Sequence, residues 1–547
     1  MSEVTSRAVG TARKKYIIAK NPLRAASVDE PDLNAVVRDL EGFAKELRAM
    51  TVGEDAEPVV MTPLSAPDTQ GVHRIEAELT DEHVEALKAK FGAGLTIEED
   101  TPLELFDSGG LFDLAQNMAS SASSDTLSVV VSVKAPDGSA VSNASVMLFG
   151  EVWSDRQLTN TQGNATLKLH GETLQTLSEL RIKPKDSFWS KVIKQPALQE
   201  RGNTVTLEPL PTSKDDPQID TWGTEAMGIV AMPNNGPVVK VAVIDSGLSG
   251  DHPDLDPAGG MSMGEGGDPA EDWKNDGSGH GTHVSGTVGA LNNAFGVRGV
   301  ADRVAIHSYQ IFPQATMSKL LRALDKAIED QVDVINMSLG GSSSSVVLQE
   351  RLQAVRNAGI LPIAAAGNNG GKVMYPAAYS EVMAVAAVGR VGTFPEDSHH
   401  TAHVTGTNTA NGAYFAARFT CRGPEIDVCG PGVAVISTVP GKGYASFDGT
   451  SMASPHVAGF AAVKLAQSPS ILNMQRSGAR AKALFDAVVA ACQDLGLEAE
   501  LQGRGMPVLQ GVVPPPPAPA PQPGDDVLAD VSDLLARAIA AVKKIKV

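Results

Sequence analysis

Three segments of the chain carry residues that could together perform nucleophilic catalysis. Asp245 directly follows an apolar run typical of a buried strand. His280 stands in the Gly-rich segment 277–286, and Ser451 opens a stretch of small, helix-compatible residues. A serine hydroxyl becomes a nucleophile when a histidine takes its proton, and a carboxylate can fix the tautomer of that histidine and stabilise its cation. The chain order Asp, His, Ser is one in which such triads occur.

Each of these residues also has a plainer interpretation. Asp245 could be a turn residue after a strand, His280 a structural histidine, and Ser451 an N-cap. The joint occurrence of the three motifs in this order favours the catalytic interpretation. His283 and His456, which lie close to the motifs, are expected to pack within helices.

The three motifs together resemble those of the subtilisin-like serine peptidases, over roughly residues 216–510. The resemblance implies that Ser451 attacks a peptide carbonyl, that His280 transfers the proton and that Asp245 orients the imidazole. It also implies that Asn368, in an Ala-Ala-Ala-Gly-Asn segment, stabilises the oxyanion together with the backbone N–H of Ser451. The alternative for Asn368 is an ordinary loop residue.

The resemblance extends to the substrate cleft. It implies one strand that pairs with the substrate backbone, and a wall and a floor for the pocket that takes the side chain before the cut. A methionine at the floor predicts a shallow pocket that favours small or medium side chains, unless this side chain turns into the core. The residues are Ser338, Leu339 and Gly340 in the strand, Ala365, Ala366 and Gly367 in the wall, and Met374 at the floor.

A structural Ca²⁺ site is also implied by the resemblance. Side-chain oxygens and alternate backbone carbonyls of a flexible loop suit this hard cation. Without the resemblance, the Asn-Asn pair in the loop would simply indicate a turn. The expected ligands are Gln218, Asp254, Leu291, Asn293, Phe295 and Val297.

One segment departs from the family pattern. Residues 393–414 form a longer connection than most relatives carry, and they include His399, His400 and His403. These histidines could bind a metal, but the preferred interpretation is a polar surface loop that shapes the cleft or contacts another domain.

The elements that position the motifs follow an α/β pattern. Near-continuous apolar runs at 238–244 and 360–366 are typical of buried parallel strands. Helical patterns at 319–330 and 346–357 lie between such strands. The sequence therefore predicts a doubly wound, mostly parallel sheet in a catalytic domain over 211–512.

Residues 1–14 are expected to be disordered and 15–106 to form a small α+β domain. Thr80 can cap a helix whose first turn carries Asp81 and Glu82. This domain resembles the inhibitory propeptide of the same family, which implies autocleavage after Phe106. An aromatic residue before the cut conflicts with a shallow pocket, and the conflict stays open at this point.

The remaining segments are a linker at 107–125, a small β-sandwich at 126–210, a Pro-rich linker at 513–524 and an amphipathic helix at 525–547. The sandwich resembles carboxypeptidase-regulatory or transthyretin-like modules in its pattern only. It is expected to be a spacer or docking module, with adhesion or substrate binding as the alternative. The C-terminal helix is expected to dock or self-associate, and contact with a membrane surface is its alternative.

The net charge, the cysteine count and the apolar runs limit the partners and locations expected for the chain. A formal net charge of -19 argues against nucleic acid, which needs clustered basic residues. The three cysteines are too few for a disulfide framework; buried thiols are expected, and one Cys421–Cys429 bridge is the alternative. The chain shows no signal-peptide pattern and no apolar run long enough to span a membrane. A cytoplasmic location is expected for the sequence as given, with export from an upstream start or by another route left open.

The sequence thus predicts a serine endopeptidase, made as a self-inhibited precursor and matured by autocleavage, that acts on proteins or peptides. The alternative is a scaffold or binding protein on a protease fold whose proteolysis is limited to self-processing. The complete Asp245, His280, Ser451 and Asn368 set favours the enzyme, because a binding role needs none of these residues.

Overall fold

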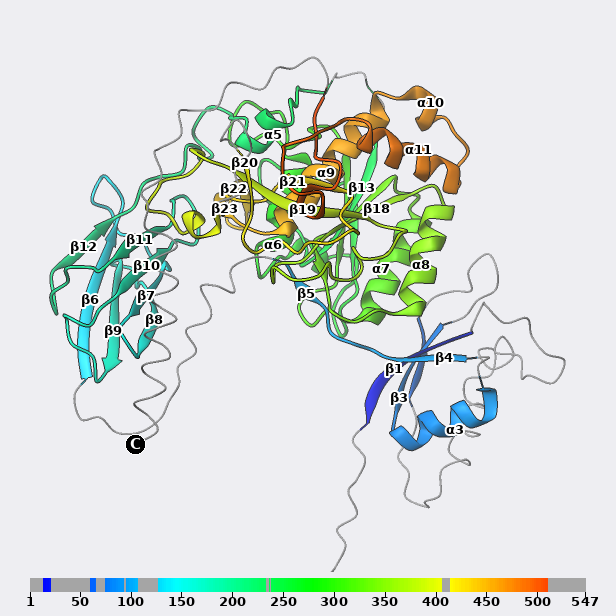
Figure 1. Cartoon of the computed structure of the whole chain (residues 1–547), viewed down its shortest axis with the longest axis horizontal. Coiled ribbons are helices and arrows are strands. Elements are labelled where there is room, and N and C mark those ends of the chain that lie inside the picture. Colours follow the sequence, from blue (N-terminus) through cyan, green and yellow to red (C-terminus); the bar gives the residue numbers. More distant parts are fainter. Residues whose placement is uncertain are drawn as a thin grey trace, which may run out of the picture.

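The computed structural model describes three bodies, a central α/β domain with a small unit at either end (Figure 1). The described residues are 13–20, 60–64, 74–92, 95–106, 126–232, 236, 238–405 and 414–509. The predicted linker 107–125, the Pro-rich linker 513–524 and the helix 525–547 lie outside them. The segment 1–14, expected to be disordered, ends inside the first strand, because that strand begins at Lys14.

The N-terminal unit is an antiparallel sheet with one helix packed on it. The strand order is β2-β3-β1-β4, and Ile18 of β1 lies opposite Ile75 of β3 and Ile97 of β4. Thr80 caps the helix, because its Oγ1 accepts the N–H of His83 while His83 Nδ1 accepts the N–H of Thr80. The elements are β1 (Lys14–Lys20), β2 (Met61–Pro63), β3 (Arg74–Leu79), α3 (Asp81–Phe91) and β4 (Leu95–Glu99).

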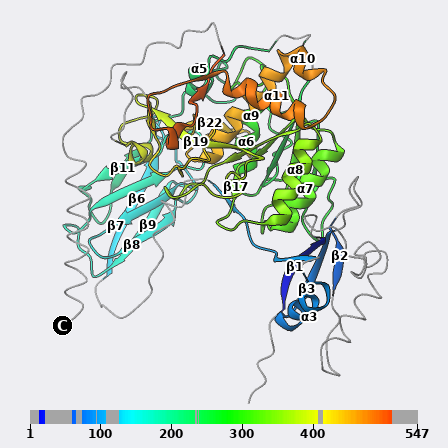
Figure 2. The same ribbon diagram turned by 45° about the vertical axis from the view of Figure 1, so that its right-hand side comes forward.

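Two carboxylates from the end of β4 attach this unit to the central domain. Glu98 accepts the N–H of Val346 at 2.8 Å, at the start of helix α8 (Val346–Asn357). Asp100 accepts the N–H of Ser318 at 2.8 Å, at the start of helix α7 (Met317–Glu329). Both acids thus satisfy free N–H groups and complement the helix dipoles. The unit consequently lies below the ends of α7 and α8 (Figure 2).

The second small unit is a β-sandwich of two sheets. The first has the order β11-β10-β7-β8 and the second β12-β6-β9. In β6 every second residue from Val129 to Val133 is fully buried, which is the alternation expected for a strand with one face in a core. The strands are β6 (Thr126–Lys134), β7 (Ser145–Phe149), β8 (Ser154–Leu158), β9 (Asn164–His170), β10 (Glu179–Lys183), β11 (Lys191–Lys194) and β12 (Asn203–Thr206).

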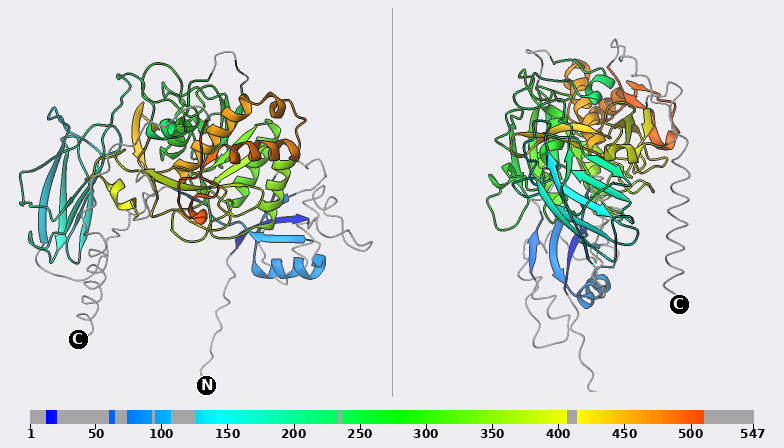
Figure 3. Two further views of the ribbon diagram at one scale, coloured as in Figure 1. Left: turned by 45° about the horizontal axis from the view of Figure 1, so that its top comes forward. Right: turned by 90° about the vertical axis from the view of Figure 1, so that its left-hand side faces the viewer.

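The sandwich contacts the central domain through the start of β11 and the residues just before this strand. Lys191 forms an ion pair with Asp397 at 2.5 Å, and the N–H of Val192 donates to the carbonyl of the same residue. Trp189 packs edge-on against the ring of His400. The sandwich and the N-terminal unit lie on different sides of the central domain (Figure 3).

The central domain contains a mostly parallel sheet in the order β14-β15-β13-β16-β18-β19-β20, with β21 also paired to β19. All of its pairs are parallel except β19 with β20. The predicted α/β fold class is therefore confirmed. The strands are β13 (Lys240–Asp245), β14 (Gly259–Ser262), β15 (Ala305–Gln310), β16 (Val334–Met337), β18 (Leu361–Ala365), β19 (Met383–Arg390), β20 (Tyr414–Ala416) and β21 (Val428–Pro431).

The chain winds in two directions from β13. It passes through α6 (His280–Gly289) to β15 on one side, then through α7 to β16 and through α8 to β18 on the other. Because such crossovers are right-handed, α6 lies on one face of the sheet and α7 and α8 on the other. Helix α9 (Thr450–Ala466) packs against α6. The reversal at β13 creates the crevice where α/β proteins bind ligands.

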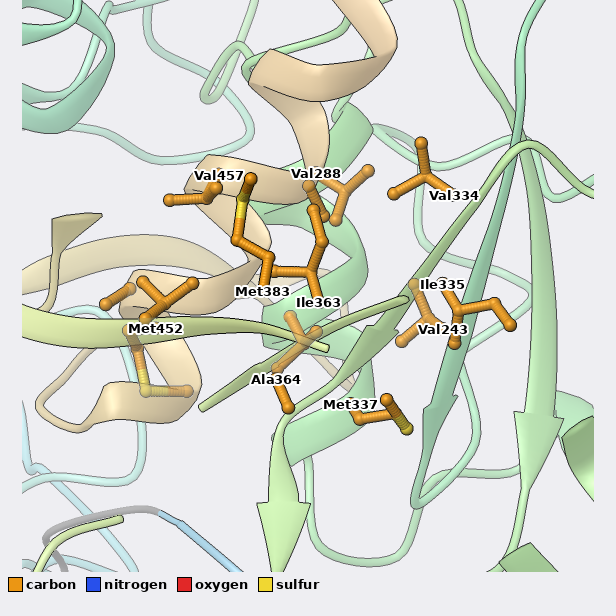
Figure 4. Close-up of a cluster of buried hydrophobic side chains, with 14 of the residues drawn as sticks. Val243, Val288, Val334, Ile335, Met337, Ile363, Ala364, Met383, Met452 and Val457 are labelled. Atoms are coloured by element: carbon orange, nitrogen blue, oxygen red, sulfur yellow. The ribbon is translucent and has the colours of Figure 1, made fainter. Parts of the chain in front are cut away.

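The core between the sheet and the α6–α9 pair is built from aliphatic and methionine side chains (Figure 4). Val288 of α6 and Val457 of α9 lie beside Ile363 and Met383 of the sheet, and all four are fully buried. Each such side chain contributes about 1.5–3 kcal/mol through burial. The two helices whose first turns carry His280 and Ser451 are thereby fixed on the sheet.

Short elements complete the central domain. They are α5 (Trp222–Ala226), η2 (Asp272–Lys274), η3 (His399–His403), β22 (Val435–Val439), β23 (Gly443–Phe447), α10 (Pro469–Leu472), α11 (Gly478–Val489), β24 (Cys492–Gln493), α12 (Ala499–Gln502) and β25 (Met506–Pro507). Cys421 and Cys429 are buried free thiols, so the alternative of a bridge between them is wrong. In the described part of the chain, no helix has the length and apolarity needed to span a membrane.

Candidate active site

Asp245 and His280 form a buried pair at the reversal point of the sheet. Asp245 is the last residue of β13, and its Oδ1 lies 2.8 Å from Nδ1 of His280, the first residue of α6. The N–H of Ser246 donates to the same carboxylate oxygen at 2.7 Å. Both side chains are almost completely buried, so little water competes for the contact between carboxylate and imidazole.

A second carboxylate holds the start of α6 in place. Asp276 accepts the N–H groups of Gly279 and Thr282, at 2.9 and 2.8 Å. It also accepts the hydroxyl of Ser246, which in turn accepts the N–H of Gly281. A Cβ on Gly281 would lie 2.1 Å from the carbonyl oxygen of Gly247, so only glycine allows this close approach. Asp276 and Ser246 were missed in the sequence, although an Asp shortly before a predicted helix is a capping signal.

The two neighbouring histidines are packing residues. The Nε2 of His283 lies 3.0 Å from the carbonyl of Val435, and its ring stacks on Phe447. Burial lowers the pKa of His283 to about 3 and that of His456 to about 4, so both imidazoles are neutral.

Ser451 is the second residue of α9 and is fully buried. In this structure its hydroxyl donates to the carbonyl of Ser338 at 2.9 Å. The hydroxyl of Ser338 donates back to the carbonyl of Ser451, also at 2.9 Å, and thereby fixes the first turn of α9 on the end of β16. Since α6 and α9 pack together, His280 and Ser451 occupy the N-terminal turns of two adjacent helices.

Two hydrogen-bond donors converge on the carbonyl oxygen of Phe106. The N–H of Ser451 lies at 3.2 Å and Nδ2 of Asn368 at 2.5 Å from this oxygen. The other end of the Asn368 amide accepts from Thr450, both from its N–H at 2.9 Å and from its hydroxyl at 2.8 Å. The amide is thus oriented with its donor end toward the carbonyl, which is the arrangement of an oxyanion hole.

The segment before Phe106 lies as a strand between two edges of the central domain. On one side β5 (Glu104–Leu105) pairs antiparallel with β17 (Leu339–Gly340). On the other side the N–H of Leu103 donates to the carbonyl of Ala315 at 3.0 Å. The strand expected to bind substrate, Ser338 to Gly340, therefore binds the end of the chain's own N-terminal unit.

The side chain of Phe106 is only 4% exposed. Its ring packs against Gly340, where a Cβ would come within 2.7 Å of two ring atoms. Met374 packs directly against Gly367, where a Cβ would lie 2.8 Å from the Met374 sulfur. The same sulfur is 3.8 Å from the side-chain amide nitrogen of Asn369. The phenyl ring of Phe106 is therefore enclosed beside Gly340, and the shallow pocket expected from Met374 stays a prediction. Ala365 and Ala366 are fully buried beside Gly367.

The six predicted calcium ligands lie together. Nε2 of Gln218 contacts four oxygens, those of Leu291 (2.6 Å), Asn293 (3.4 Å), Phe295 (3.2 Å) and Val297 (3.2 Å). The fully buried Asp254 accepts Nδ2 of Asn293 at 2.9 Å. Four oxygens converge on the NH2 group of one side-chain amide, and such a ring of oxygens suits a hard cation. The donor set fits Ca²⁺ once the Gln218 amide turns its oxygen toward the same point.

Tyr444 adds a contact that the sequence did not indicate. Its hydroxyl donates to Oδ2 of Asp254 at 2.6 Å. Burial, together with this carboxylate, raises the pKa of Tyr444, so the phenol remains a donor at neutral pH. Tyr444 belongs to β23, and its carbonyl accepts the N–H of Ser187 from the β-sandwich.

The histidines of the long segment are buried, so the predicted polar surface loop is wrong. The expected contact of this segment with another domain is present, because Nδ1 of His399 lies 2.5 Å from the hydroxyl of Ser190 in the β-sandwich. His399, His400 and His403 lie on η3 and are buried. They face the buried carboxylate of Asp448. Burial alone would raise the pKa of Asp448, but these imidazoles hold it well below the usual range. Burial lowers the pKa of His399 to about 3. Sequence reasoning missed Asp448, because nothing in its neighbourhood distinguishes it from a turn residue.

The fold and this geometry define a class of protein. A buried Asp–His pair at the edge of a doubly wound sheet, a serine in a helix N-terminal turn and a donor pair on a peptide carbonyl are the parts of a serine hydrolase that acts on extended polypeptide. Comparison with known proteins agrees, since the model of the Subtilase family (peptidase S8) matches residues 236–505.

Three similar proteins are the subtilisin of Bacillus pumilus, subtilisin DY of Bacillus licheniformis and subtilisin E of Bacillus subtilis strain 168. The first is 41% identical over 249 residues, which are 44% of this chain and 81% of that protein. The second is 40% identical over a match that covers 43% of this chain and 80% of that protein. The third is also 40% identical, and the match covers 44% of this chain and 58% of that protein. This chain belongs to the subtilase family and is a subtilisin-like serine endopeptidase.

Proposed function

We propose that this chain is a self-inhibited precursor that cleaves itself after Phe106 and then hydrolyses other polypeptides. The observation that supports this most directly is the position of the Phe106 carbonyl, between the N–H of Ser451 and the amide of Asn368. A carbonyl held by these two donors is polarised for attack.

In this proposal Ser451 is the nucleophile. Its hydroxyl turns from the carbonyl of Ser338 toward His280, which takes the proton as Ser451 Oγ bonds to the carbonyl carbon. Asp245 keeps the His280 imidazole in the tautomer that has its proton on Nδ1 and stabilises the cation. Asn368 and the backbone N–H of Ser451 hold the oxyanion. His280 then gives its proton to the leaving amine, and water hydrolyses the acyl-enzyme by the reverse steps.

The N-terminal unit acts as the inhibitor in the same proposal. After cleavage, strand β5 still pairs with β17, and Glu98 and Asp100 still cap α8 and α7. Because these contacts do not involve the broken bond, the product stays in the cleft until the unit dissociates or is degraded. Cleavage after Phe106 leaves the β-sandwich attached to the enzyme.

The buried ring of Phe106 leads to a prediction about specificity. Phe106→Asp replaces the buried ring with a carboxylate. The variant loses about 1.5–3 kcal/mol of stabilisation from burial of the ring, and burying the carboxylate is itself unfavourable. We therefore expect self-cleavage to slow by about 10- to 100-fold. Phe106→Leu, the matched control, keeps an apolar side chain and stays close to the parent rate. Intact-mass time courses after refolding measure the rates. Unchanged cleavage in Phe106→Asp, or a mature N-terminus near residue 215, would contradict the proposed site.

We also propose that Ca²⁺ binds at the six-residue site and stabilises the loop that follows α6. The side chains of Gln218, Asp254 and Asn293 would hold it with the carbonyls of Leu291, Phe295 and Val297. The bound ion would neutralise the negative charge of the buried Asp254 carboxylate and so stabilise the fold.

This leads to a stability prediction. In a Ser451→Ala background, which prevents autolysis, Ca²⁺ at one hundred times its Kd stabilises the folded chain by about 2.7 kcal/mol. The added stability is seen as a higher Tm in thermal scans. Asp254→Ala removes the calcium-dependent shift, while Asp256→Ala, an exposed carboxylate two residues away, retains it. Equal calcium shifts in both variants would reject the site.

A further inference from the structure

A second cluster of metal-binding side chains lies outside the catalytic site. Oδ2 of Asp448 is 2.7 Å from Nε2 of His399 and 3.4 Å from Nε2 of His403, and Oδ1 is 2.7 Å from Nδ1 of His400. All four side chains are buried. The ligand atoms of His399, His400 and Asp448 lie within 4.8 Å of one another.

The proposed proteolytic mechanism does not use this cluster. The carboxylate of Asp448 faces the imidazoles and the N–H of Ala434, at 2.7 Å, whereas Ser451 faces Ser338 and Phe106. The cluster nevertheless joins three parts of the molecule. His399 to His403 belong to the long segment 393–414, Asp448 comes three residues before Ser451, and Ser190 reaches the cluster from the β-sandwich.

In two of the imidazoles the nitrogen that points away from Asp448 contacts a hydroxyl group. Histidines that bind metals usually have such a hydrogen bond on the nitrogen that does not bind the metal. The hydroxyl of Ser190 lies 2.5 Å from Nδ1 of His399, and that of Ser446 lies 3.1 Å from Nε2 of His400. In each ring the nitrogen that contacts Asp448 is the one that would bind a metal, while the opposite nitrogen contacts a hydroxyl. Such contacts fix the ring orientation and the tautomer of a ligating histidine.

The difference between the present distances from His to Asp448 atoms and the ligand spacing around a tetrahedral ion sets how far the ligands would move on metal binding. With bonds of about 2.0–2.1 Å, neighbouring ligands of a tetrahedral Zn²⁺ lie about 3.3–3.4 Å apart. His403 and Asp448 already have this separation. The two 2.7 Å contacts would need to widen by roughly 0.6 Å. The imidazole nitrogens of His399 and His400, which lie within 4.8 Å of each other, would need to reach the same tetrahedral spacing.

We propose that His399, His400, His403 and Asp448 form a structural site for a divalent transition metal, with Zn²⁺ as the best-suited ion. Three imidazoles and one carboxylate favour Zn²⁺ over Ca²⁺, which requires oxygen ligands. A complete set of four protein ligands is typical of a structural site rather than a catalytic one. The ion ties the β-sandwich and the long segment to the turn that carries Ser451. Without the ion, the same contacts are hydrogen bonds to Asp448.

Direct metal binding tests the proposal. The full-length chain with Ser451→Ala is dialysed against Zn²⁺ in excess Ca²⁺, which saturates the oxygen site, and its metal content is measured by plasma mass spectrometry. We expect about one Zn²⁺ per chain. Asp448→Asn and His403→Ala weaken this binding by about 100-fold or more, as loss of a direct ligand requires. The control is His307→Ala, because His307 also lies near a carboxylate, 3.9 Å from Asp330, but outside the cluster.

A second measurement leaves the four proposed ligands unchanged, so its result does not depend on how a ligand variant folds. Co²⁺ bound to the parent chain gives the intense visible bands of a tetrahedral ion with nitrogen ligands. These bands, together with loss of zinc in Asp448→Asn but not in His307→Ala, support the site. Absence of zinc from the Ser451→Ala chain together with absence of the cobalt bands, or equal zinc content after Asp448→Asn, would overturn it and leave a purely hydrogen-bonded cluster.

Discussion

We expect the Ser451→Ala chain to lose peptidase activity by about 10⁶-fold, the loss that removal of the nucleophile causes in subtilisin, a relative of this protein. The variant has no hydroxyl to attack the Phe106 carbonyl, so it also remains a single chain of 56.9 kDa. Binding of the N-terminal unit is retained, because the contacts of Glu98, Asp100 and β5 do not involve the Ser451 side chain.

Three measurements check this expectation. A fluorophosphonate probe labels the processed parent but not Ser451→Ala, intact mass follows self-cleavage, and turnover of an added protein substrate separates general proteolysis from self-processing alone. Ser477→Ala serves as the control, since Ser477 precedes α11 and its hydroxyl donates to the carbonyl of Gln475. Self-cleavage of Ser451→Ala at the parent rate would refute the assignment of the nucleophile.

The parts of the site that the sequence revealed are those encoded within a few consecutive residues. Asp245 follows an apolar strand, and the small residues around His280 and Ser451 allow close packing of two helix starts, so short motifs specify both geometry and chemistry. The alternation in β6 and the cap at Thr80 are equally local signals. Predicted helices 319–330 and 346–357 correspond to α7 and α8, with α7 shifted by one or two residues, because helix ends are the least determined feature.

The parts that the sequence did not reveal depend on contacts between distant residues. Tyr444 meets Asp254 across 190 positions, and His400 meets Asp448 across 48. A polar, His-containing segment gives no sign of burial, because burial depends on what packs over it. The depth of the Phe106 pocket likewise depends on Gly340 and on where Met374 turns, which no local pattern fixes.

The second large effect concerns Asn368. Its Nδ2 contacts the Phe106 carbonyl at 2.5 Å, where negative charge develops during attack. We expect Asn368→Ala to lower kcat by about 10²–10³-fold, or about 3–4 kcal/mol of barrier, which is the magnitude known for one such donor in subtilisin. KM changes little, because the donor binds the oxyanion more strongly than the ground-state carbonyl. Steady-state kinetics of the processed enzyme on a Phe-containing peptide measures both constants.

Asn369→Ala is the matched control, because the neighbouring amide contacts the sulfurs of Met374 and Cys421 and not the Phe106 carbonyl. Asn368 also accepts two hydrogen bonds from Thr450, so its removal could act by loosening the turn that carries Ser451. Asn368→Asp separates the two effects, since it keeps acceptors for Thr450 but loses the donor. Loss of kcat in both Asn368 variants, with Tm lowered only in Asn368→Ala, assigns the effect to the donor. An Asn368→Asp enzyme with the parent kcat would show that this side chain serves only to hold Thr450.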